Sequence, residues 1–214
     1  MAKITLSFDN GPDPEVTPRV LDILAQHGIA ATFFVIGEKL AAPGGRELAE
    51  RARADGHWIG NHTYTHGTPL GEDRSADAPE REIGATQALM QGLANERKLF
   101  RPFGGGGHLD SRVLSQAARD YLAAGGYTCV LWNSVPGDWK DADWAVTAKQ
   151  QVASQPWSLV VLHDIPGACI EGLDGYLSEL EDDGHEFVQE FPPDCVPMES
   201  GRLLRPEVLP EPAF

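Results

Sequence analysis

Cysteine is scarce in this sequence, and long apolar runs are missing from it. The three cysteines, Cys129, Cys169 and Cys195, are odd in number and widely separated, and no Cys-x-x-Cys motif is present. This usage predicts neither a disulfide framework nor a structural zinc cluster, so stability must come from a buried apolar core. No run approaches the ~18–20 apolar residues that a membrane helix needs, so no membrane-spanning segment is expected.

Positive charge is also scarce. The 17 Lys and Arg residues are outnumbered by 32 Asp and Glu residues, which gives a formal net charge of −15 at pH 7. Binding to nucleic acids or to anionic membranes depends on clustered cations, so neither is expected as a partner. Met1 leads almost directly into the apolar residues 4–8, without the three regions of a signal peptide. The expected location is therefore the cytoplasm.

Strand-like and helix-like patterns alternate along the chain. Seven short apolar runs predict strands at residues 4–8, 31–36, 57–61, 99–102, 127–132, 159–163 and 186–189. Apolar residues at helical spacing between these runs predict helices at residues 17–28, 46–55, 83–93, 110–125, 143–153 and 173–184. Thr17 is expected to cap the first helix, with Pro18 in its first turn. This alternation predicts an α/β fold with a parallel sheet, as either a doubly wound sheet or a closed barrel.

The last part of the sequence is rich in proline. Six of the 16 prolines fall within residues 191–214. Because proline fixes φ and lacks a backbone donor, no regular structure is expected there. We therefore expect one domain over residues 1–190 and an extended tail over residues 191–214 that packs on it.

Charged and polar side chains stand near the C-terminal ends of five predicted strands. In chain order they are Asp9, Asn10, His62, His66, Arg101, Asp138 and His163. In parallel α/β folds, this edge of the sheet is where ligands bind and catalytic groups gather. The placement therefore predicts an active site there.

Taken singly, these residues also have structural interpretations. His62 and His66 are four residues apart, and two imidazoles on one helical turn converge on one point, as in zinc hydrolases. They could equally be solvated or capping histidines in a loop. Residues 9–12 could form a plain tight turn, and His163 could be a buried histidine satisfied by Asp164.

Taken together, the residues resemble the NodB-type polysaccharide deacetylases, metal-dependent enzymes that remove N-acetyl groups from glucosamine residues. Five motifs of that family are matched in order over residues 4–164. They are a strand ending in acidic residues and a glycine (7–12), a His-x-x-x-His pair (62–66), an arginine followed by proline, an aromatic residue and glycine (100–105), a tryptophan-led segment ending in Asp-Trp (132–139), and an apolar strand ending in histidine (160–163). The resemblance implies a distorted (β/α)7 barrel.

The resemblance also implies roles in catalysis. Asp9 would be the general base, and Arg101 would keep it ionised and oriented. His163 would be the general acid that protonates the leaving amine, and Asp138 would tune its charge.

A divalent metal ion is implied as well, expected to be Zn²⁺ or a similar ion, held by His62, His66 and Asn10. The family has a second aspartate at the position of Asn10. An amide oxygen is a weaker donor to Zn²⁺ than a carboxylate and adds no charge, so we expect looser metal binding. A working site, a metal-free site and an inactive site all remain open.

The resemblance further implies substrate contacts from Phe103, Gly104 and Trp139, and a backbone N–H in residues 103–105 that could stabilise an oxyanion. Gly104 replaces an aromatic residue that is common in the family, and Val135 replaces an earlier aspartate. The glycine run 104–107 is no phosphate loop, because no Gly-Lys-Ser/Thr follows it.

The predicted function is hydrolysis of non-peptide C–N bonds. The first expectation is removal of N-acetyl groups from a small amino sugar or an oligosaccharide. One alternative is an amidase on a small cyclic amide or ureide, acting with or without metal. The other is a catalytically silent carbohydrate-binding relative, with Asn10 marking the lost activity. The first expectation requires Asp9, His62, His66 and His163 to surround one cavity.

Overall fold

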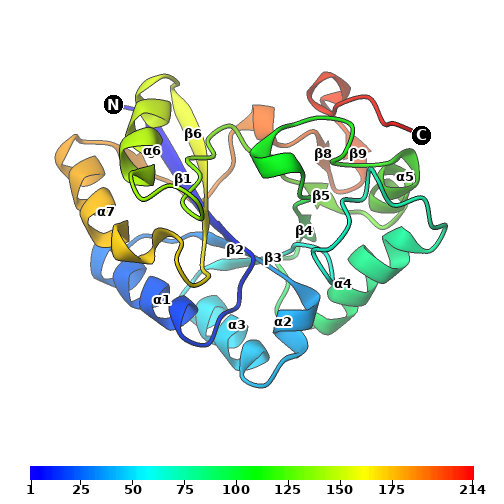
Figure 1. The fold of residues 1–214 in the computed structure, drawn as a ribbon, viewed down its shortest axis with the longest axis horizontal. Helices are drawn as coiled ribbons and strands as arrows, with labels where there is room; N and C mark the ends of the chain where they lie inside the picture. Colours follow the sequence, from blue (N-terminus) through cyan, green and yellow to red (C-terminus); the bar gives the residue numbers. More distant parts are fainter.

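A curved sheet forms the centre of the molecule (Figure 1). The structure is a computed structural model that describes residues 1–214. The strand order is β6-β1-β2-β3-β4-β5-β8-β9, and β7 pairs with the start of β1. The strands are β1 (Lys3–Asp9), β2 (Thr32–Val35), β3 (Trp58–Asn61), β4 (Leu99–Phe100), β5 (Thr128–Cys129), β6 (Trp157–His163), β7 (Glu186–Phe187), β8 (Met198–Glu199) and β9 (Arg202–Leu203). The strands from β6 to β5 in this order are parallel, whereas β8 and β9 are antiparallel additions.

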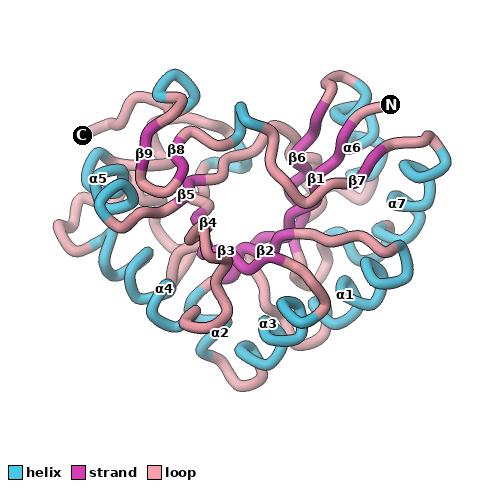
Figure 2. Tube along the Cα trace, turned by 180° about the vertical axis from the view of Figure 1, so that it is seen from behind, coloured by secondary structure: helices cyan, strands magenta, loops and turns pink.

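Helices surround the outside of this sheet, as Figure 2 shows. The α-helices are α1 (Val16–His27), α2 (Gly37–Ala41), α3 (Gly45–Ala54), α4 (Ala85–Leu89), α5 (Gln116–Ala124), α6 (Trp144–Ala153) and α7 (Leu173–Asp182). A π-helical turn, η1 (Glu80–Gly84), leads into α4, and the short 3-10 turns are η2 (Gly105–Gly107), η3 (Cys169–Glu171), η4 (Pro193–Cys195) and η5 (Pro206–Val208). The largest apolar cluster lies between the helices α1, α3, α6 and α7 and the strands β1, β2 and β6. No helix has the length and apolar character that crossing a membrane would require.

The barrel is closed by a single bridge. Beyond β5 the chain crosses to β6, where Ser134 pairs in parallel with Val160. The Ser134 N–H donates to the carbonyl of Leu159 (3.2 Å), and the Val161 N–H donates to the carbonyl of Ser134 (2.9 Å). The α/β class and the distorted barrel are therefore confirmed, and the doubly wound alternative is set aside.

The strand β1 carries the core on one face and the site on the other. Successive side chains of a strand point to opposite faces. Ile4, Leu6 and Phe8 join the apolar cluster under the helices, so Ser7 and Asp9 face the barrel interior. Both faces of β1 are buried, as expected for a parallel strand covered on both sides.

All seven predicted strands and all six predicted helices are present, with some shifts in their ends. The predicted cap of the first helix is wrong. The helix α1 begins at Val16, and the N–H groups of Glu15 and Val16 donate to Oδ1 of Asp13 (3.0 and 2.9 Å). The Thr17 hydroxyl instead donates to Oδ2 of Asp164 (2.5 Å). The short helix α2 was not predicted, because five residues are too few to show a helical period.

The proline-rich tail contains regular structure, which differs from the expectation. The strand β8 pairs antiparallel with β5, and β9 pairs with β8. Phe191, Cys195 and Val196 are buried in an apolar cluster with strand residues of the barrel. The prolines flank the two strands, where they remove no hydrogen bond of the sheet. The division of the chain at residue 190 stays a prediction.

Candidate active site

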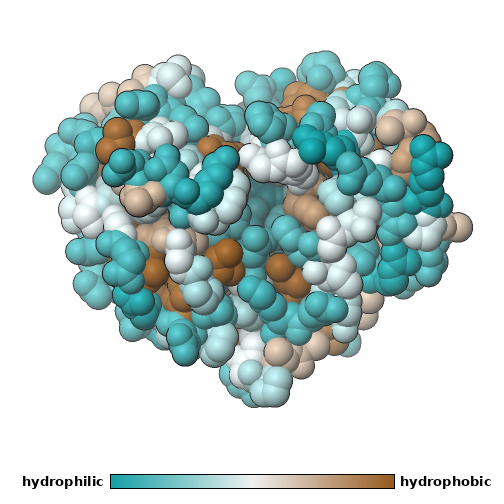
Figure 3. Space-filling view, viewed as in Figure 1, coloured by the Kyte–Doolittle hydropathy of each residue, from teal (hydrophilic) through white to brown (hydrophobic).

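The polar strand ends meet at one open cavity of about 400 Å³. Most of the predicted site residues line it, namely Asp9, Asn10, His62, His66, Phe103, Gly104, Trp139 and His163. Arg101 and Asp138 are buried behind this wall and bond to Asp9 and His163. Figure 3 shows a hollow near the middle of the face seen in Figure 1, with polar and apolar side chains around it. The four residues on which the predicted chemistry depends therefore share one cavity.

Asp9 is held by a fully buried guanidinium. Nη1 of Arg101 donates to Oδ1 of Asp9 (2.9 Å) and to the hydroxyl of Ser7 (2.6 Å). The other nitrogens of Arg101 donate to the carbonyls of Val130 (3.3 Å) and Leu131 (3.2 Å). A buried charge is tolerated when its donors find partners in this way. The carboxylate of Asp9 is thereby fixed in one orientation.

The charge of Asp9 is also set by this environment. Burial by itself raises the pKa of a carboxyl group. The positive charge of Arg101 opposes the effect of burial, and His62 and His163 lower the pKa in the same direction as Arg101. The pKa of Asp9 therefore lies below its ordinary value. Asp9 is therefore ionised near neutral pH and can accept a proton.

His62 and His66 converge, but they do so from a loop. The predicted helical turn is wrong, because Thr63 and His66 have φ of 68° and 52° and no helix spans these residues. The ring centroids of the two histidines lie 5.0 Å apart. The Nδ1 of His62 donates to the carbonyl of Arg101 (2.8 Å), which leaves Nε2 free at 3.6 Å from Oδ2 of Asp9.

Both histidines of this pair are neutral near pH 7. Burial is the main effect that lowers the pKa of His62. Burial, assisted by the neighbouring His62, lowers the pKa of His66 to about 3. The ring of His66 also stacks on Phe103, with centroids 3.9 Å apart and planes 21° apart. Neutral imidazoles are the form that binds metal ions.

Asn10 provides the test of whether these residues fit a metal ion. Asn10 lines the cavity with His62 and His66, and its side-chain oxygen is buried and has no hydrogen-bond partner. A buried carbonyl oxygen without a partner is unfavourable. The structure contains no group of three or more His, Cys, Asp and Glu side chains arranged for a metal. Two neutral imidazoles and one amide oxygen without a partner, all from residues at this cavity, are nevertheless donor types that fit a divalent ion.

His163 is paired with Asp138 on the other side of the cavity. Nδ1 of His163 hydrogen-bonds to Oδ1 of Asp138 (2.7 Å), and its backbone N–H donates to Oδ2 (2.8 Å). Burial alone lowers the pKa of a histidine, but the hydrogen bond and the charge of Asp138 outweigh it and raise the pKa of His163. Trp139 packs edge-on against the ring, with centroids 4.7 Å apart. The imidazole is therefore suited to carry a proton near neutral pH.

The glycine run forms one wall of the cavity. Residues 104–107 line it together with Trp132 and Val135. The indole N–H of Trp132 donates to the carbonyl of Gly107 (2.6 Å). Gly107 has φ of 91°, and a Cβ there would lie 2.8 Å from Val135. Glycine is thus required at position 107 by both conformation and space.

Two residues of the site were not predicted from the sequence. Ser7 contacts Arg101, and it could have been predicted from its position two residues before Asp9 on the same face of β1. Glu82 contacts the backbone between His62 and His66. Glu82 could not have been predicted in this way, because a single acidic residue in a helical stretch has no pattern that marks it as part of a site.

Comparisons with known proteins show which family this chain resembles in sequence. The polysaccharide deacetylase family profile matches residues 2–130. A peptidoglycan-N-acetylglucosamine deacetylase of Bacillus cereus is 32% identical over 193 residues, and the alignment covers 87% of this chain and 66% of that protein. A chitooligosaccharide deacetylase of Bradyrhizobium is 35% identical over 164 residues, covering 75% of this chain and 70% of the relative.

Solved structures show the same likeness. A peptidoglycan N-acetylglucosamine deacetylase, Bc1960, aligns with a TM-score of 0.72 at 30% identity, covering 87% of this chain and 85% of the other. A family 4 acetyl xylan esterase from Clostridium thermocellum, in complex with a cobalt ion, aligns with a TM-score of 0.70 at 28% identity, with 87% of each chain covered. The fold is that of the solved enzymes of the deacetylase class. This chain belongs to the polysaccharide deacetylase family, which confirms the resemblance predicted from the sequence.

Proposed function

We propose that the protein is a metal-dependent hydrolase that removes N-acetyl groups from the amino sugars of a small saccharide or an oligosaccharide. The observation that carries this proposal is the shared cavity of Asp9, His62, His66 and His163. A carboxylate held by a buried arginine and a histidine held by a buried aspartate face the same space. This arrangement supports paired base and acid catalysis of amide hydrolysis.

In this proposal, His62, His66 and Asn10 hold a divalent ion, with Zn²⁺ as the expected metal. When bound, such an ion polarises the amide carbonyl and lowers the pKa of a water molecule. Asp9 accepts the proton of the attacking water, because Arg101 keeps its carboxylate ionised and oriented. The N–H of Phe103 donates no hydrogen bond within the protein, which leaves it available to an oxyanion.

His163 completes the reaction by protonating the leaving amine. Its Nδ1 is held by Asp138, so the proton is delivered from Nε2. The C–N bond breaks as the amine takes this proton, and the products are acetate and a free amino group. Asp138 stabilises the imidazolium before the transfer, and Trp139 fixes the plane of the ring.

The substrate class follows from the cavity and from the relatives. The aromatic rings of Phe103 and Trp139 at the cavity suit the apolar face of a sugar. The net charge of −15 disfavours strongly anionic polymers. Relatives named for chitooligosaccharides and for N-acetylglucosamine of peptidoglycan support an N-acetylated amino sugar. A cytoplasmic location stays a prediction of the sequence.

The test is acetate release from N-acetylglucosamine oligomers by protein stripped of metal and then supplied with Zn²⁺ or Co²⁺. The proposal expects turnover that returns with added metal and is lost in the Asp9→Asn variant. Turnover of a cyclic amide or ureide that is indifferent to chelation would favour the alternative amidase. Binding of the oligomers without acetate release under any metal would favour the silent carbohydrate-binding alternative.

A further inference from the structure

Glu82 is a buried acid outside the cavity. It lies on the π-helical turn η1 just before α4, and only 6% of its side chain is exposed. Single π-helical turns are rare and often mark functional sites. A carboxylate removed from water needs several hydrogen bonds to offset the loss of hydration.

The partners of this carboxylate come from the loop between His62 and His66. Oε2 of Glu82 accepts from the backbone N–H groups of Tyr64 (3.1 Å) and Thr65 (2.9 Å). Oε1 accepts from the hydroxyl of Thr65 (3.0 Å). The only cation nearby is Arg81, whose Nε lies 3.7 Å from Oε1. The charge of Glu82 is therefore directed mainly at the backbone of this loop.

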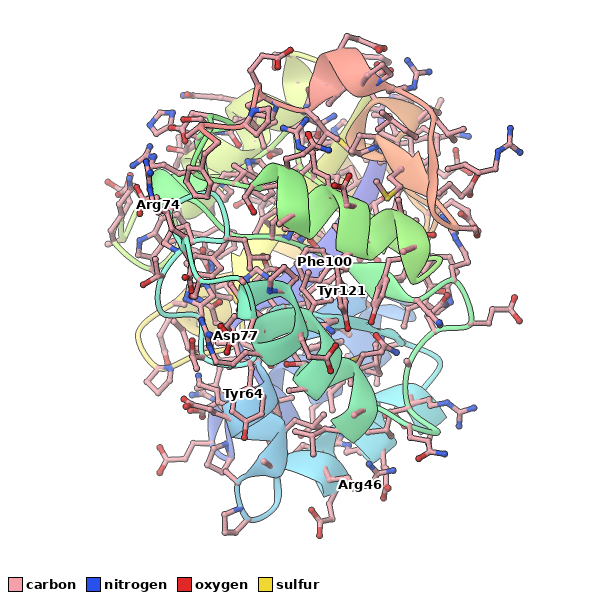
Figure 4. The ribbon with its side chains drawn as sticks, turned by 90° about the vertical axis from the view of Figure 1, so that its right-hand side faces the viewer. Arg46, Tyr64, Arg74, Asp77, Phe100 and Tyr121 are labelled. Atoms are coloured by element: carbon pink, nitrogen blue, oxygen red, sulfur yellow. The ribbon has the colours of Figure 1, made fainter.

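The opposite side of the loop is held by the start of α2. The N–H groups of Gly37 and Glu38 donate to the carbonyls of Thr63 and Tyr64, each at 2.9 Å. The side chain of Asn61 accepts from the N–H of Thr63 (3.0 Å). Figure 4, with Tyr64 and Asp77 labelled, shows the loop beside the segment that leads into η1. The peptide groups of residues 63–65 are thus held from two directions.

These hydrogen bonds from outside the loop take the place of the hydrogen bonds that a helix would form within it. A helical turn fixes two histidines through its own hydrogen bonds, but residues 62–66 form no helix. Thr63 and His66 instead adopt positive φ, which is uncommon for residues with side chains and needs support from outside. Without Glu82, two loop N–H groups would lose their acceptor.

We propose that Glu82 is a positioning residue for the metal site, because it fixes the loop that sets His62 relative to His66. This inference rests on the proposed function, since it assumes that the two histidines hold a metal. Glu82 does not line the cavity, so it acts only through the loop. Groups that orient metal ligands typically change affinity by about 10- to 100-fold when they are lost.

The experiment is a titration of metal-free protein with Co²⁺, followed by its visible absorption spectrum. We expect Glu82→Ala to weaken Co²⁺ binding by about 10- to 100-fold and to alter the spectrum. Glu82→Gln offers an oxygen to the two N–H groups and an N–H to the Thr65 hydroxyl, so it should bind within a few-fold of the wild type. Glu80→Ala is the matched control, because Glu80 lies on the same turn but is exposed and bonds only to the Tyr121 hydroxyl.

Each outcome decides the matter. A folded Glu82→Ala protein that binds Co²⁺ like the wild type, with the same spectrum, would overturn the role of Glu82 and leave the metal site intact. Wild-type protein that binds no Co²⁺ would overturn the proposed site and the inference together. If Glu82→Ala does not fold, Glu82→Asp decides instead, because its shorter side chain cannot reach both N–H groups. Affinity unchanged in that variant, with the melting temperature alone reduced, would contradict the proposal.

Discussion

Asp9 and His163 are register partners at the ends of the adjacent parallel strands β1 and β6. They are far apart in the sequence, yet the pairing of the two strands places them side by side at one edge of the sheet. The proposed base and acid therefore come from the two longest strands of the barrel. Their relative position depends on backbone hydrogen bonds, so it needs no loop to maintain it.

Replacing Asn10 by aspartate tests how the site differs from that of the family. The Asn10→Asp change adds a negative charge at a buried oxygen that has no hydrogen-bond partner. We expect metal affinity to rise by about tenfold or more, equivalent to ~1.4 kcal/mol, and acetate release at limiting metal to rise with it. Asn10→Ala, which removes the oxygen, should weaken binding. Isothermal titration with Zn²⁺ measures both variants, and equal affinities across all three proteins would remove Asn10 from the ligand set.

Arg101 is expected to contribute to both stability and activity. Arg101→Met leaves the carboxylate of Asp9 buried without its partner, and losses of this kind cost about 3–5 kcal/mol. Urea unfolding measures the change in free energy. Arg19→Met is a matched control, because the pair of Arg19 with Glu171 is exposed and such pairs contribute about 1 kcal/mol or less. Similar losses in the two variants would contradict the account given of Arg101.

The pH dependence of turnover reports on His163 and Asp138. The general acid must be protonated, so turnover falls as the pH rises through the pKa of His163. That pKa is raised, because the hydrogen bond and charge of Asp138 outweigh the effect of burial. The alkaline limb of the pH–rate profile should therefore lie above the ordinary histidine pKa and move to lower pH in Asp138→Asn.

His163→Gln complements this measurement. Losing a general acid typically costs about 10²-fold or more, and the alkaline limb due to this group should disappear. A loss of only about twofold, with the limb retained, would assign the limb to another group and remove the role of His163.

Stability should depend on pH through His27, which joins α1 to α7. Both ring nitrogens contact carboxylates, Nδ1 with Glu181 (2.9 Å) and Nε2 with Asp174 (3.0 Å). Burial alone lowers the pKa of His27, but these hydrogen bonds raise it overall. Stabilisation from a raised pKa is complete below the unfolded value, near 6.5, and is lost as the pH rises through the folded value.

The difference in melting temperature between the wild type and His27→Gln should therefore be largest near pH 6 and shrink towards pH 9. His185→Gln is a useful comparison, because the ring of His185 accepts a backbone N–H and contacts no carboxylate. A difference for His27→Gln that does not change with pH would show that the imidazolium form is not what joins the two helices.

The sequence predicts local features of this protein well and long-range contacts poorly. The strands β1 and β6 were predicted, at residues 4–8 and 159–163, because each is a short apolar run with a charged or titratable side chain at its end. The convergence of His62 and His66 was predicted for the wrong reason, since a loop held by Glu82 takes the place of a helix. That contact joins two segments whose pairing no local pattern records. The short strands of the tail were hidden for the same reason, because their partner is the distant β5.

The single bridge between Ser134 and Val160 makes the barrel wall uneven. Two backbone hydrogen bonds join the wall at this seam, whereas β1 and β6 are paired along their whole length. The segment just beyond the seam carries Asp138, so the partner of the proposed acid lies next to a part of the barrel wall that a single bridge holds. In amide hydrogen exchange, the protons of Ser134 and Val161 should therefore be replaced sooner than those at the centre of β1, and widening of the cavity would begin there.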